Sequence, residues 1–390
     1  MPPILPHPLQ PEPEALAHSA RLRSEINRVI RQSGGWIDFS RFMALVLYAP
    51  GLGYYSAGSV KLGSGGDFVT APEMTPLFGQ TWARAVAATL DGLRGQHPMV
   101  LELGAGSGRL ARDLLLALAA LGTLPERYLI LEVSADLRER QEALLATLPA
   151  ALRARVDWCS AWPAALTGVV LANEVLDALP VHRVGWRQEG WVEMGVTLEG
   201  EDWAWQQHPL TDARVAALLP PTDGLPVPYD TEVCPDAAAL MASLAHSLKA
   251  GRAYFIDYGF PAREYYHPQR HEGTLMCHVR HHAHGDPFAY PGLQDVTAHV
   301  DFTAVTRAAL DHGLVLEDYG AMARWLLDAG LLEVLGAIPV TDEARYLPAV
   351  SAVQKLLSPA EMGELFKVLV LGKGQGSPAA SALLGLPQGT

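Results

Sequence analysis

The stretch Val100-Leu-Glu-Leu-Gly-Ala-Gly-Ser-Gly-Arg109 decides the fold of this chain. Its first four residues are typical of a buried strand, and Gly104, Gly106 and Gly108 follow at alternate positions. Leucines then recur at helical spacing between residues 110 and 118. A strand, a glycine turn and a helix begin a βαβ unit. Glycine is required in such a turn because the backbone takes positive φ, and because a Cβ would strike a nucleotide-like ligand lying against it.

The spacing of the glycines separates two classes of ligand. Dinucleotide sites carry G-x-G-x-x-G, whereas here Arg109 stands where the last glycine of that pattern belongs. The form Glu-x-Gly-x-Gly-x-Gly resembles motif I of S-adenosylmethionine-dependent methyltransferases, and a purely structural turn is the alternative. The resemblance implies that the cofactor contacts include Glu102, Gly104, Ala105, Gly106 and Gly108.

A second acidic residue supports a nucleoside ligand. Tyr128-Leu-Ile-Leu-Glu-Val133 is typical of a second buried strand, and its Glu132 follows Gly106 by 26 residues. A βαβ unit delivers an acidic residue to a ribose at about this distance, roughly 20 residues on. A carboxylate accepts hydrogen bonds from two vicinal hydroxyls, so Glu132 is the candidate ribose ligand. The alternative is a solvated glutamate at a strand end.

The composition is that of an ordinary globular protein with an acidic balance. The 390 residues are 49% hydrophobic and carry 29 Lys and Arg against 42 Asp and Glu, a net charge of −13. Because non-specific nucleic-acid binding needs a basic surface, no nucleic-acid partner is expected. Three widely separated cysteines predict no disulfide framework.

The N-terminal residues guide the expected location. Residues 1–20 hold six prolines and no Lys or Arg, which is typical neither of a secretory signal nor of an Arg-rich mitochondrial presequence. No run of residues reaches the length of a membrane span. We therefore expect a cytoplasmic protein of bacterial type that begins with a flexible, proline-rich tail.

The rest of the chain is expected to fold in two main parts. Residues 21–95 show helical apolar spacing around a glycine-rich loop and predict an N-terminal helical cap. Residues 96–374 predict the α/β domain, interrupted by an antiparallel β and loop excursion at 182–235 and by a substrate-side loop at 258–303. Residues 375–390, rich in Gly, Pro, Ser and Ala, are expected to form a flexible C-terminal tail.

Seven strands with crossover helices predict a doubly wound, mostly parallel sheet that is covered on both faces. Ligands of such sheets bind beyond the carboxyl ends of the strands. This rule places Gly104–Gly108, Glu132, Asn173–Glu174 and Asp257–Tyr258 on one rim. The expected strands are 99–103, 128–133, 154–158, 168–172, 252–257, 313–319 and 365–371.

Candidate catalytic residues follow the fourth expected strand. Asn173 and Glu174 would face the reactive end of the cofactor. The Asn/Asp-Pro-Pro-aromatic sequence usual in nucleobase amino-methylating enzymes is missing here, whereas a glutamate suits a guanidinium that it can hold bidentately. Asp177 lies three residues on. On a helix it would share a face with Glu174 as a second anion, and a helix-capping or solvated Asp177 is the alternative.

The His-rich segment Cys277-His-Val-Arg-His-His-Ala-His284 invites a metal interpretation. Zinc needs about four ligands in a supported geometry, and these histidines crowd one loop without a cysteine pair or an H-E-x-x-H motif. A partly exposed loop is the favoured interpretation, and we expect no metal site. His299 and Asp301 are interpreted either as site residues or as buried hydrogen-bonded struts.

Six separate segments together resemble the MidA family. They are Gly66-Asp-Phe-Val-Thr-Ala-Pro-Glu73, Phe78-Gly79, Glu102–Gly108, Asn173–His182, Asp257-Tyr-Gly259 and Asp295–Phe302, and they lie within residues 20–374. This family includes the mitochondrial complex I assembly methyltransferase, which acts on protein arginine. The resemblance implies a class I methyltransferase fold whose last strand is antiparallel, and S-adenosylmethionine as cofactor. It also implies that a loop carrying Asp67, Thr70 and Glu73 lies over the cofactor.

The leading functional prediction is a protein arginine N-methyltransferase with a protein substrate. The alternatives are methylation of a small-molecule oxygen or nitrogen, and a non-catalytic assembly factor that retains the cofactor pocket. A nicotinamide-dependent oxidoreductase is disfavoured by Arg109. Apolar surface on helices expected at 76–93 and 342–357 would serve a homodimer.

Overall fold

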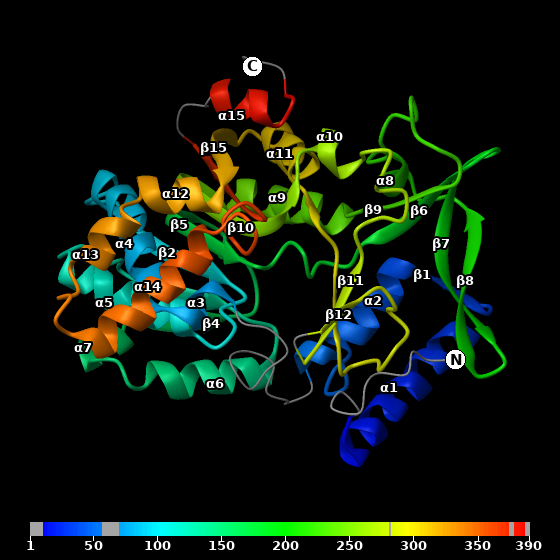
Figure 1. Ribbon diagram of the computed structural model, residues 1–390, viewed down its shortest axis with the longest axis horizontal. Coiled ribbons are helices and arrows are strands. Elements are labelled where there is room, and N and C mark those ends of the chain that lie inside the picture. The colour runs from blue at the N-terminus through cyan, green and yellow to red at the C-terminus, as the bar shows by residue number, and fades with distance from the viewer. Residues whose placement is uncertain (1–10, 57–69, 281, 374–377, 387–390) are drawn as a thin grey trace. The chain divides into compact units, whose positions relative to one another are not determined.

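The computed structural model describes residues 11–56, 70–280, 282–373 and 378–386. The chain forms two compact units. The first comprises residues 1–68, 177–239 and 262–301, and the second comprises residues 69–176, 240–261 and 302–390. The glycine turn and the strands around it belong to the second unit (Figure 1).

The second unit is built on a mixed sheet. Seven of its strands run in the order β15-β16-β10-β5-β2-β3-β4. The five strands from β10 to β4 are parallel, and β16 is antiparallel to both of its neighbours. The strands are β2 (Met99–Leu103), β3 (Tyr128–Leu131), β4 (Val156–Cys159), β5 (Leu166–Asn173), β10 (Leu248–Phe260), β15 (Val315–Ala321) and β16 (Phe366–Gly372). The expected α/β class is therefore confirmed, and every expected strand of this sheet forms within a few residues of its predicted bounds.

The sheet is central because its strands are apolar on both faces. In β5, five consecutive residues from Gly168 to Ala172 are buried, as expected for a parallel strand covered by helices. One face carries the alternate residues Val100, Val169 and Leu171, and these pack with helices into one large core. On the other face, Phe302 of α11 (Phe302–Asp311) packs on Tyr319 of β15.

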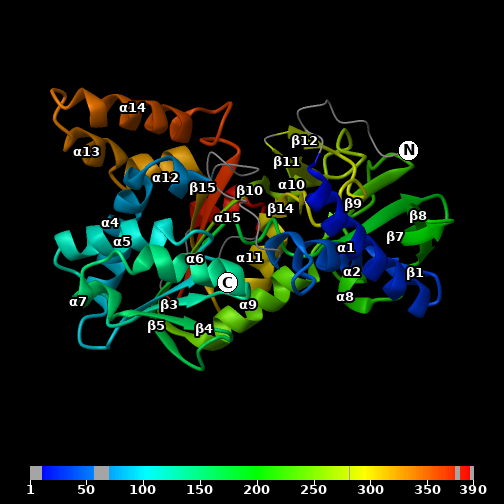
Figure 2. The ribbon, with the colours of Figure 1, turned by 90° about the horizontal axis from the view of Figure 1, so that it is seen from below.

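Helices of the second unit complete this core. Trp82 of α4 stacks on Trp325 of α12 with ring centroids 4.0 Å apart, and α13 packs against α4 (Figure 2). The helices are α3 (Ala71–Met74), α4 (Pro76–Gly92), α5 (Arg109–Ala120), α6 (Ala135–Leu145), α7 (Ala150–Arg153), α12 (Met322–Asp328), α13 (Leu331–Gly336), α14 (Glu343–Leu357) and α15 (Pro378–Leu383). The chain passes between the units within α9 (Pro235–Ser247).

The first unit has its own antiparallel sheet. The strands β1 (Trp36–Asp38), β7 (Gly190–Glu199), β6 (His182–Arg187) and β9 (Tyr229–Val233) pair in that order, and β8 (Asp202–Pro209) pairs with β7 in a long hairpin (Figure 1). Helices α1 (Pro13–Gln32) and α2 (Phe39–Tyr48) pack on it through residues such as Ile26, Phe42 and Trp203. Shorter elements are η2 (Tyr54–Ser56), α8 (Ala213–Ala216), α10 (Ala262–Tyr265) and β14 (Val300–Asp301).

Three expectations about the ends and loops are wrong. Residues 13–20 of the expected N-terminal tail form the start of α1, which begins with a proline at a position where no N–H is needed. Part of the expected C-terminal tail forms α15, after which Leu384 and Leu386 are buried. The expected loop 258–303 contains a three-stranded antiparallel sheet of β11 (Met276–Val279), β12 (His282–His284) and β13 (Asp295–Thr297).

The helical segment expected at 21–95 is divided between the units. Helix α4 belongs to the second unit and packs on α5, because its apolar residues Phe78 and Trp82 are buried in that core. This burial leaves α4 poorly suited to the homodimer surface expected of it, whereas Leu347 of α14 is 61% exposed. Within the described residues, no helix is both long and apolar enough to cross a membrane.

Candidate functional site

The glycine turn has the backbone that the sequence predicts. Gly104, Gly106 and Gly108 have φ values of 58°, 53° and 85°, in the left-handed region that costs other residues about 1–2 kcal/mol. Gly104 N donates to Leu131 O at 3.0 Å, which ties the turn to the end of β3. Ala105 is 8% exposed and accepts a 2.8 Å hydrogen bond from Gly108 N at its carbonyl. The turn therefore presents backbone with few side-chain atoms.

The loop before α4 is anchored on this turn through Glu73. One carboxylate oxygen of Glu73 accepts a hydrogen bond from Ser107 Oγ, and the other lies 2.8 Å from Arg109 Nε. Thr70 precedes α3 and accepts a hydrogen bond from Glu73 N at 3.0 Å. Asp67 lies outside the described residues. Glu73 therefore contacts the glycine turn, and Thr70 contacts Glu73.

Glu132 lies directly after β3, beside the turn. Its Oε1 accepts a hydrogen bond from Ser134 N at 2.9 Å, and its Oε2 accepts one from Gln141 Nε2 at 2.9 Å. Ser134 in turn caps α6, since its side chain accepts from Leu137 N. The start of α6 therefore fixes the carboxylate that the sequence assigned to a ribose.

Glu102 lies in the core, not at the exposed strand end. Its side chain is on the same face of β2 as Val100, the residue is 3% exposed, and Tyr128 Oη donates to its Oε2 at 2.7 Å. Burial raises the pKa of Glu102 to about 7, and the hydrogen bond from Tyr128 opposes that rise. This placement suits a residue that supports the turn from beneath.

The end of β5 carries Asn173 and Glu174 beside the turn, since a Cβ on Gly104 would lie 3.5 Å from Val175 Cγ2. Asn173 Nδ2 donates to Glu174 Oε1 at 3.0 Å. Glu174 has φ 54°, a strained backbone for a residue other than glycine. Its N–H donates to Ile256 O at 2.8 Å.

Asp257, which the sequence placed on the same rim without a role, holds this segment. Its Oδ2 accepts from Val175 N at 3.1 Å and from Leu176 N at 2.9 Å, and the residue is 1% exposed. Together, Asp257 and the bond from Glu174 N to Ile256 O explain how the strained turn persists. Asn173 Oδ1 is buried and accepts no hydrogen bond from any described residue.

Asp177 does not lie on a helix with Glu174. Residues 174–180 form bends and turns, and Asp257 accepts from the N–H groups of Val175 and Leu176 in this segment. Asp177 belongs to the first unit, is 6% exposed, and its carbonyl accepts from Ala298 N. Its charge and that of Asp295 raise the pKa of Tyr55, after burial as the main cause. The expectation of a shared helical face is therefore wrong.

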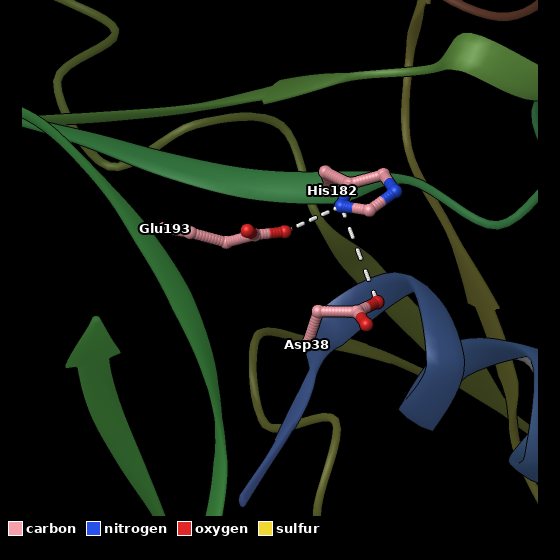
Figure 3. Close-up of side chains that lie close together, drawn as sticks. All are labelled: Asp38, His182 and Glu193. Atoms are coloured by element: carbon pink, nitrogen blue, oxygen red, sulfur yellow. Dashed lines mark hydrogen bonds and ion pairs between the residues drawn. The ribbon is translucent and has the colours of Figure 1, made fainter. Parts of the chain in front are cut away.

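Asp38, His182 and Glu193 of the first unit form a second cluster, in which one ligand-type atom from each lies within 4.8 Å of the others (Figure 3). His182 Nδ1 lies 2.6 Å from Glu193 Oε1 and 4.0 Å from Asp38 Oδ1. Ligands around one zinc ion, each about 2.0–2.2 Å from it in a tetrahedron, would stand further apart than the His182–Glu193 pair. The geometry is that of a hydrogen-bonded ion pair joining β6 to β7.

Several histidines of the first unit lie in its three-stranded sheet or next to it. Cys277 of β11 is opposite His284 of β12, and His284 Nδ1 accepts from Asp286 N at 3.2 Å. His299 N donates to Thr274 Oγ1 at 3.1 Å, and burial lowers the pKa of the His299 ring to about 4. These contacts favour the interpretation of His299 as a buried strut.

Gln141 is the site residue that sequence reasoning missed. It is fully buried on α6 and contacts both the glycine turn and Glu132. No motif marks it, because its role depends on how α6 packs against the turn. The bare turn and the adjacent carboxylate fit an adenosyl cofactor. A carboxylate accepts hydrogen bonds from the ribose hydroxyls of such a cofactor, and the cofactor has no pyrophosphate to bind.

Comparisons with known proteins agree with this site. Residues 81–320 match the family described as "Putative S-adenosyl-L-methionine-dependent methyltransferase". A crystal structure from Burkholderia thailandensis bound to S-adenosyl-homocysteine is 48% identical in sequence, with a TM-score of 0.89, and the match covers 96% of this chain and 97% of that one. The cofactor of this chain is therefore S-adenosylmethionine.

Curated relatives are mitochondrial proteins of animals. "Protein arginine methyltransferase NDUFAF7 homolog, mitochondrial" of Drosophila melanogaster is 29% identical, over 94% of this chain and 89% of its own length. The human protein "Protein arginine methyltransferase NDUFAF7, mitochondrial" is 27% identical, over 87% and 81% respectively. With the family match and the bacterial structure, these relatives establish that the chain belongs to the MidA family of S-adenosylmethionine-dependent methyltransferases.

Proposed function

We propose that this methyltransferase transfers its methyl group to arginine side chains of a protein. The observation that carries the proposal is the position of Glu174, a carboxylate held by a strained backbone at the carboxyl end of β5, beside the glycine turn. The animal relatives, which are named protein arginine methyltransferases, point the same way. In keeping with this function, we propose that the sheet of the second unit is the doubly wound sheet of a class I methyltransferase.

The proposed cofactor contacts are the turn and its neighbours. Gly104, Ala105, Gly106 and Gly108 would offer backbone to the cofactor, and Glu132 would accept hydrogen bonds from the ribose hydroxyls. Glu73 and Thr70 would hold the loop that covers it, and Glu102 would support the turn from the core. When bound, S-adenosylmethionine supplies an electrophilic methyl carbon on a positively charged sulfur.

Glu174 and Asn173 are the proposed catalytic residues. A guanidinium is a weak nucleophile because it stays protonated, with a pKa above about 12. The carboxylate of Glu174 would hold it by charge-assisted hydrogen bonds and would orient one terminal nitrogen. The methylated nitrogen must then lose one proton, and Glu174 is the proposed acceptor. Asn173 orients Glu174 through their 3.0 Å hydrogen bond.

The test is to identify the methylated residue. The purified enzyme would be incubated with isotopically labelled cofactor and a bacterial lysate, and labelled proteins would be mapped by mass spectrometry. We expect label on arginine side chains. Candidate peptides would then be assayed beside versions with lysine in place of arginine, which we expect to remain unlabelled. Label confined to small molecules or to other side chains would refute the arginine assignment.

Glu174→Gln is the diagnostic variant. It keeps the shape of the side chain and removes the charge that holds the guanidinium, so methylation should fall at least about 100-fold, while binding of S-adenosylhomocysteine is kept. A Glu174→Gln enzyme with full activity would show that another group receives the substrate. A wild-type protein that binds the cofactor and labels nothing would favour a non-catalytic assembly role.

A further inference from the structure

Gln141 of α6 makes three hydrogen bonds at the cofactor turn, each to a different element. Its Nε2 lies 3.0 Å from Gly106 O and 2.9 Å from Glu132 Oε2. Its Oε1 accepts from Trp158 Nε1 of β4 at 2.9 Å. The side chain is 0% exposed. One buried amide therefore joins the glycine turn, the carboxylate after β3 and an indole of β4.

The orientation of this amide is dictated by its partners. A carboxylate and a backbone carbonyl only accept hydrogen bonds, and an indole N–H only donates. With the amide reversed, its oxygen would face two acceptors and its nitrogen would face a donor. All three bonds would be lost inside the protein, where an unpaired polar group is costly. Gln141 thus has one stable orientation, with both amide hydrogens committed.

We propose that Gln141 is a positioning residue that sets the ribose-binding geometry of Glu132 relative to the glycine turn. This inference rests on the proposed role of Glu132. A carboxylate can accept several hydrogen bonds at once, so Glu132 can accept from a ribose hydroxyl while it is bonded to Gln141 and Ser134. Since the same NH₂ group also donates to Gly106 O, it fixes the position of the carboxylate relative to the turn.

Packing contacts around Gln141 hold its side chain in this position. A Cβ on Gly108 would lie 3.4 Å from Gln141 Cα and Cγ, so the turn and α6 are in close packing there. On the far side, the guanidinium carbons of Arg138 and Arg153 lie 5.6 Å and 5.1 Å from the Trp158 ring centroid. The indole that donates to Gln141 is therefore itself held in place.

The experiment measures calorimetrically how strongly two probes bind: S-adenosylhomocysteine and its 2′-deoxy analogue. The variants are Gln141→Glu, which keeps the acceptor for Trp158 but opposes a carboxylate to Glu132, and Gln141→Leu, which removes all three bonds. Gln354→Leu, at an exposed position on α14, is the matched control. Trp158→Phe removes only the bond to Oε1 and leaves both Gln141 donors in place.

We expect both Gln141 variants to bind S-adenosylhomocysteine about 10- to 100-fold more weakly, because the charged, partly buried carboxylate of Glu132 loses a hydrogen-bond donor. Their affinity for the 2′-deoxy analogue should fall much less, because the sugar of this analogue lacks one of the two hydroxyls that would donate to Glu132. Gln354→Leu should match wild type, and Trp158→Phe should lose less than about tenfold. A merely structural role predicts equal losses for the two probes, and that result would overturn the proposal.

Glu132→Ala separates this inference from the function on which it rests. If Glu132→Ala binds both probes like wild type, the ribose role of Glu132 is wrong and the Gln141 proposal falls with it. If Glu132→Ala loses affinity for S-adenosylhomocysteine but Gln141→Glu does not, only the Gln141 proposal is wrong. Since every readout is a binding constant, failure to find an arginine substrate would leave this test intact.

Discussion

Arg109 Nε lies 2.8 Å from Glu73 Oε2, so the residue that replaces the last glycine of a dinucleotide motif binds the loop that precedes α4. From the sequence alone, Arg109 served only as evidence against a dinucleotide-binding motif. In the structure, Arg109 and Ser107 both contact the carboxylate of Glu73, whose side chain is 8% exposed. The loop and the turn are therefore coupled through one carboxylate.

Removing this coupling should weaken cofactor binding without unfolding the protein. We expect Glu73→Gln to bind S-adenosylhomocysteine about tenfold more weakly, because charge-assisted hydrogen bonds contribute about 1.5–3 kcal/mol and half-exposed Arg109 is partly screened. Titration calorimetry measures the change. Arg94→Ala, which breaks an exposed pair with Asp91, is the control and should bind like wild type. Equal affinities for Glu73→Gln and wild type would refute the coupling.

Glu102 predicts how stability depends on pH. Burial raises its pKa from 4.5 to about 7, so the folded state holds a proton more tightly than the unfolded state does. The resulting stability is fully present below about pH 4.5 and is lost as pH rises through about 7. For a rise of about 2.5 pKa units, at about 1.4 kcal/mol per unit, the difference amounts to at most about 3.5 kcal/mol.

Glu102→Gln tests this relation because it keeps the shape and cannot ionise. Denaturant unfolding at pH 5 and pH 8 should show a smaller loss of stability for Glu102→Gln than for wild type. Tyr128→Phe removes the hydrogen bond that opposes the rise, so its loss between the two pH values should be at least as large as that of wild type. A pH dependence that is identical in Glu102→Gln and wild type would contradict the assignment.

The fold was predictable where one local pattern dominates. The apolar run Val100–Leu103 and the alternating glycines suffice for a strand and a turn, because β strands and positive φ leave clear marks in composition. The end helix α15 was missed because Gly, Pro and Ser favour disorder locally, whereas burial of Leu384 and Leu386 decides the outcome. Tertiary packing there overrides local preference.

The positions of the acidic residues at the site were easier to predict than the residues that hold them in place. Glu132 and Glu174 stand at strand ends that the sequence itself marks. Gln141 and Asp257 act through backbone groups far away in the chain, such as Gly106 O and Leu176 N. The helix expected through Glu174 and Asp177 does not form, and no local pattern announces the bond between Leu176 N and Asp257, 81 residues away.

His182 and Glu193 predict a second pH effect, in the first unit. Burial lowers the pKa of His182, but the hydrogen bond to Glu193 and the charge of Asp38 outweigh it and raise the pKa above 6.5. The stabilisation is therefore fully present below about pH 6.5 and is lost as pH rises through the folded-state value. Glu193→Gln should cost about 3 kcal/mol at pH 6, as for other broken buried pairs, and less at pH 9.

Thermal or denaturant unfolding at the two pH values measures this effect. Glu199→Gln, an exposed position on the same strand, is the control and should change stability little at either pH. If Glu193→Gln costs the same at pH 6 and pH 9, the pair is not coupled to protonation of His182.

Gly108→Ala should damage both stability and cofactor binding, and a matched glycine separates the two effects. Gly108 has φ 85° and a Cβ there would touch Gln141, whereas Gly122 has φ 73° and a Cβ there would meet nothing within 4 Å. Both alanine variants should lose about 1–2 kcal/mol of unfolding free energy from backbone strain alone. Only Gly108→Ala should bind S-adenosylhomocysteine more weakly, by about tenfold, because the new methyl group would stand against Gln141, which is bonded to Glu132. Chemical denaturation and calorimetry on both variants would check this, and equal cofactor affinity in the two would show that the contact at Gly108 does not reach the ribose site.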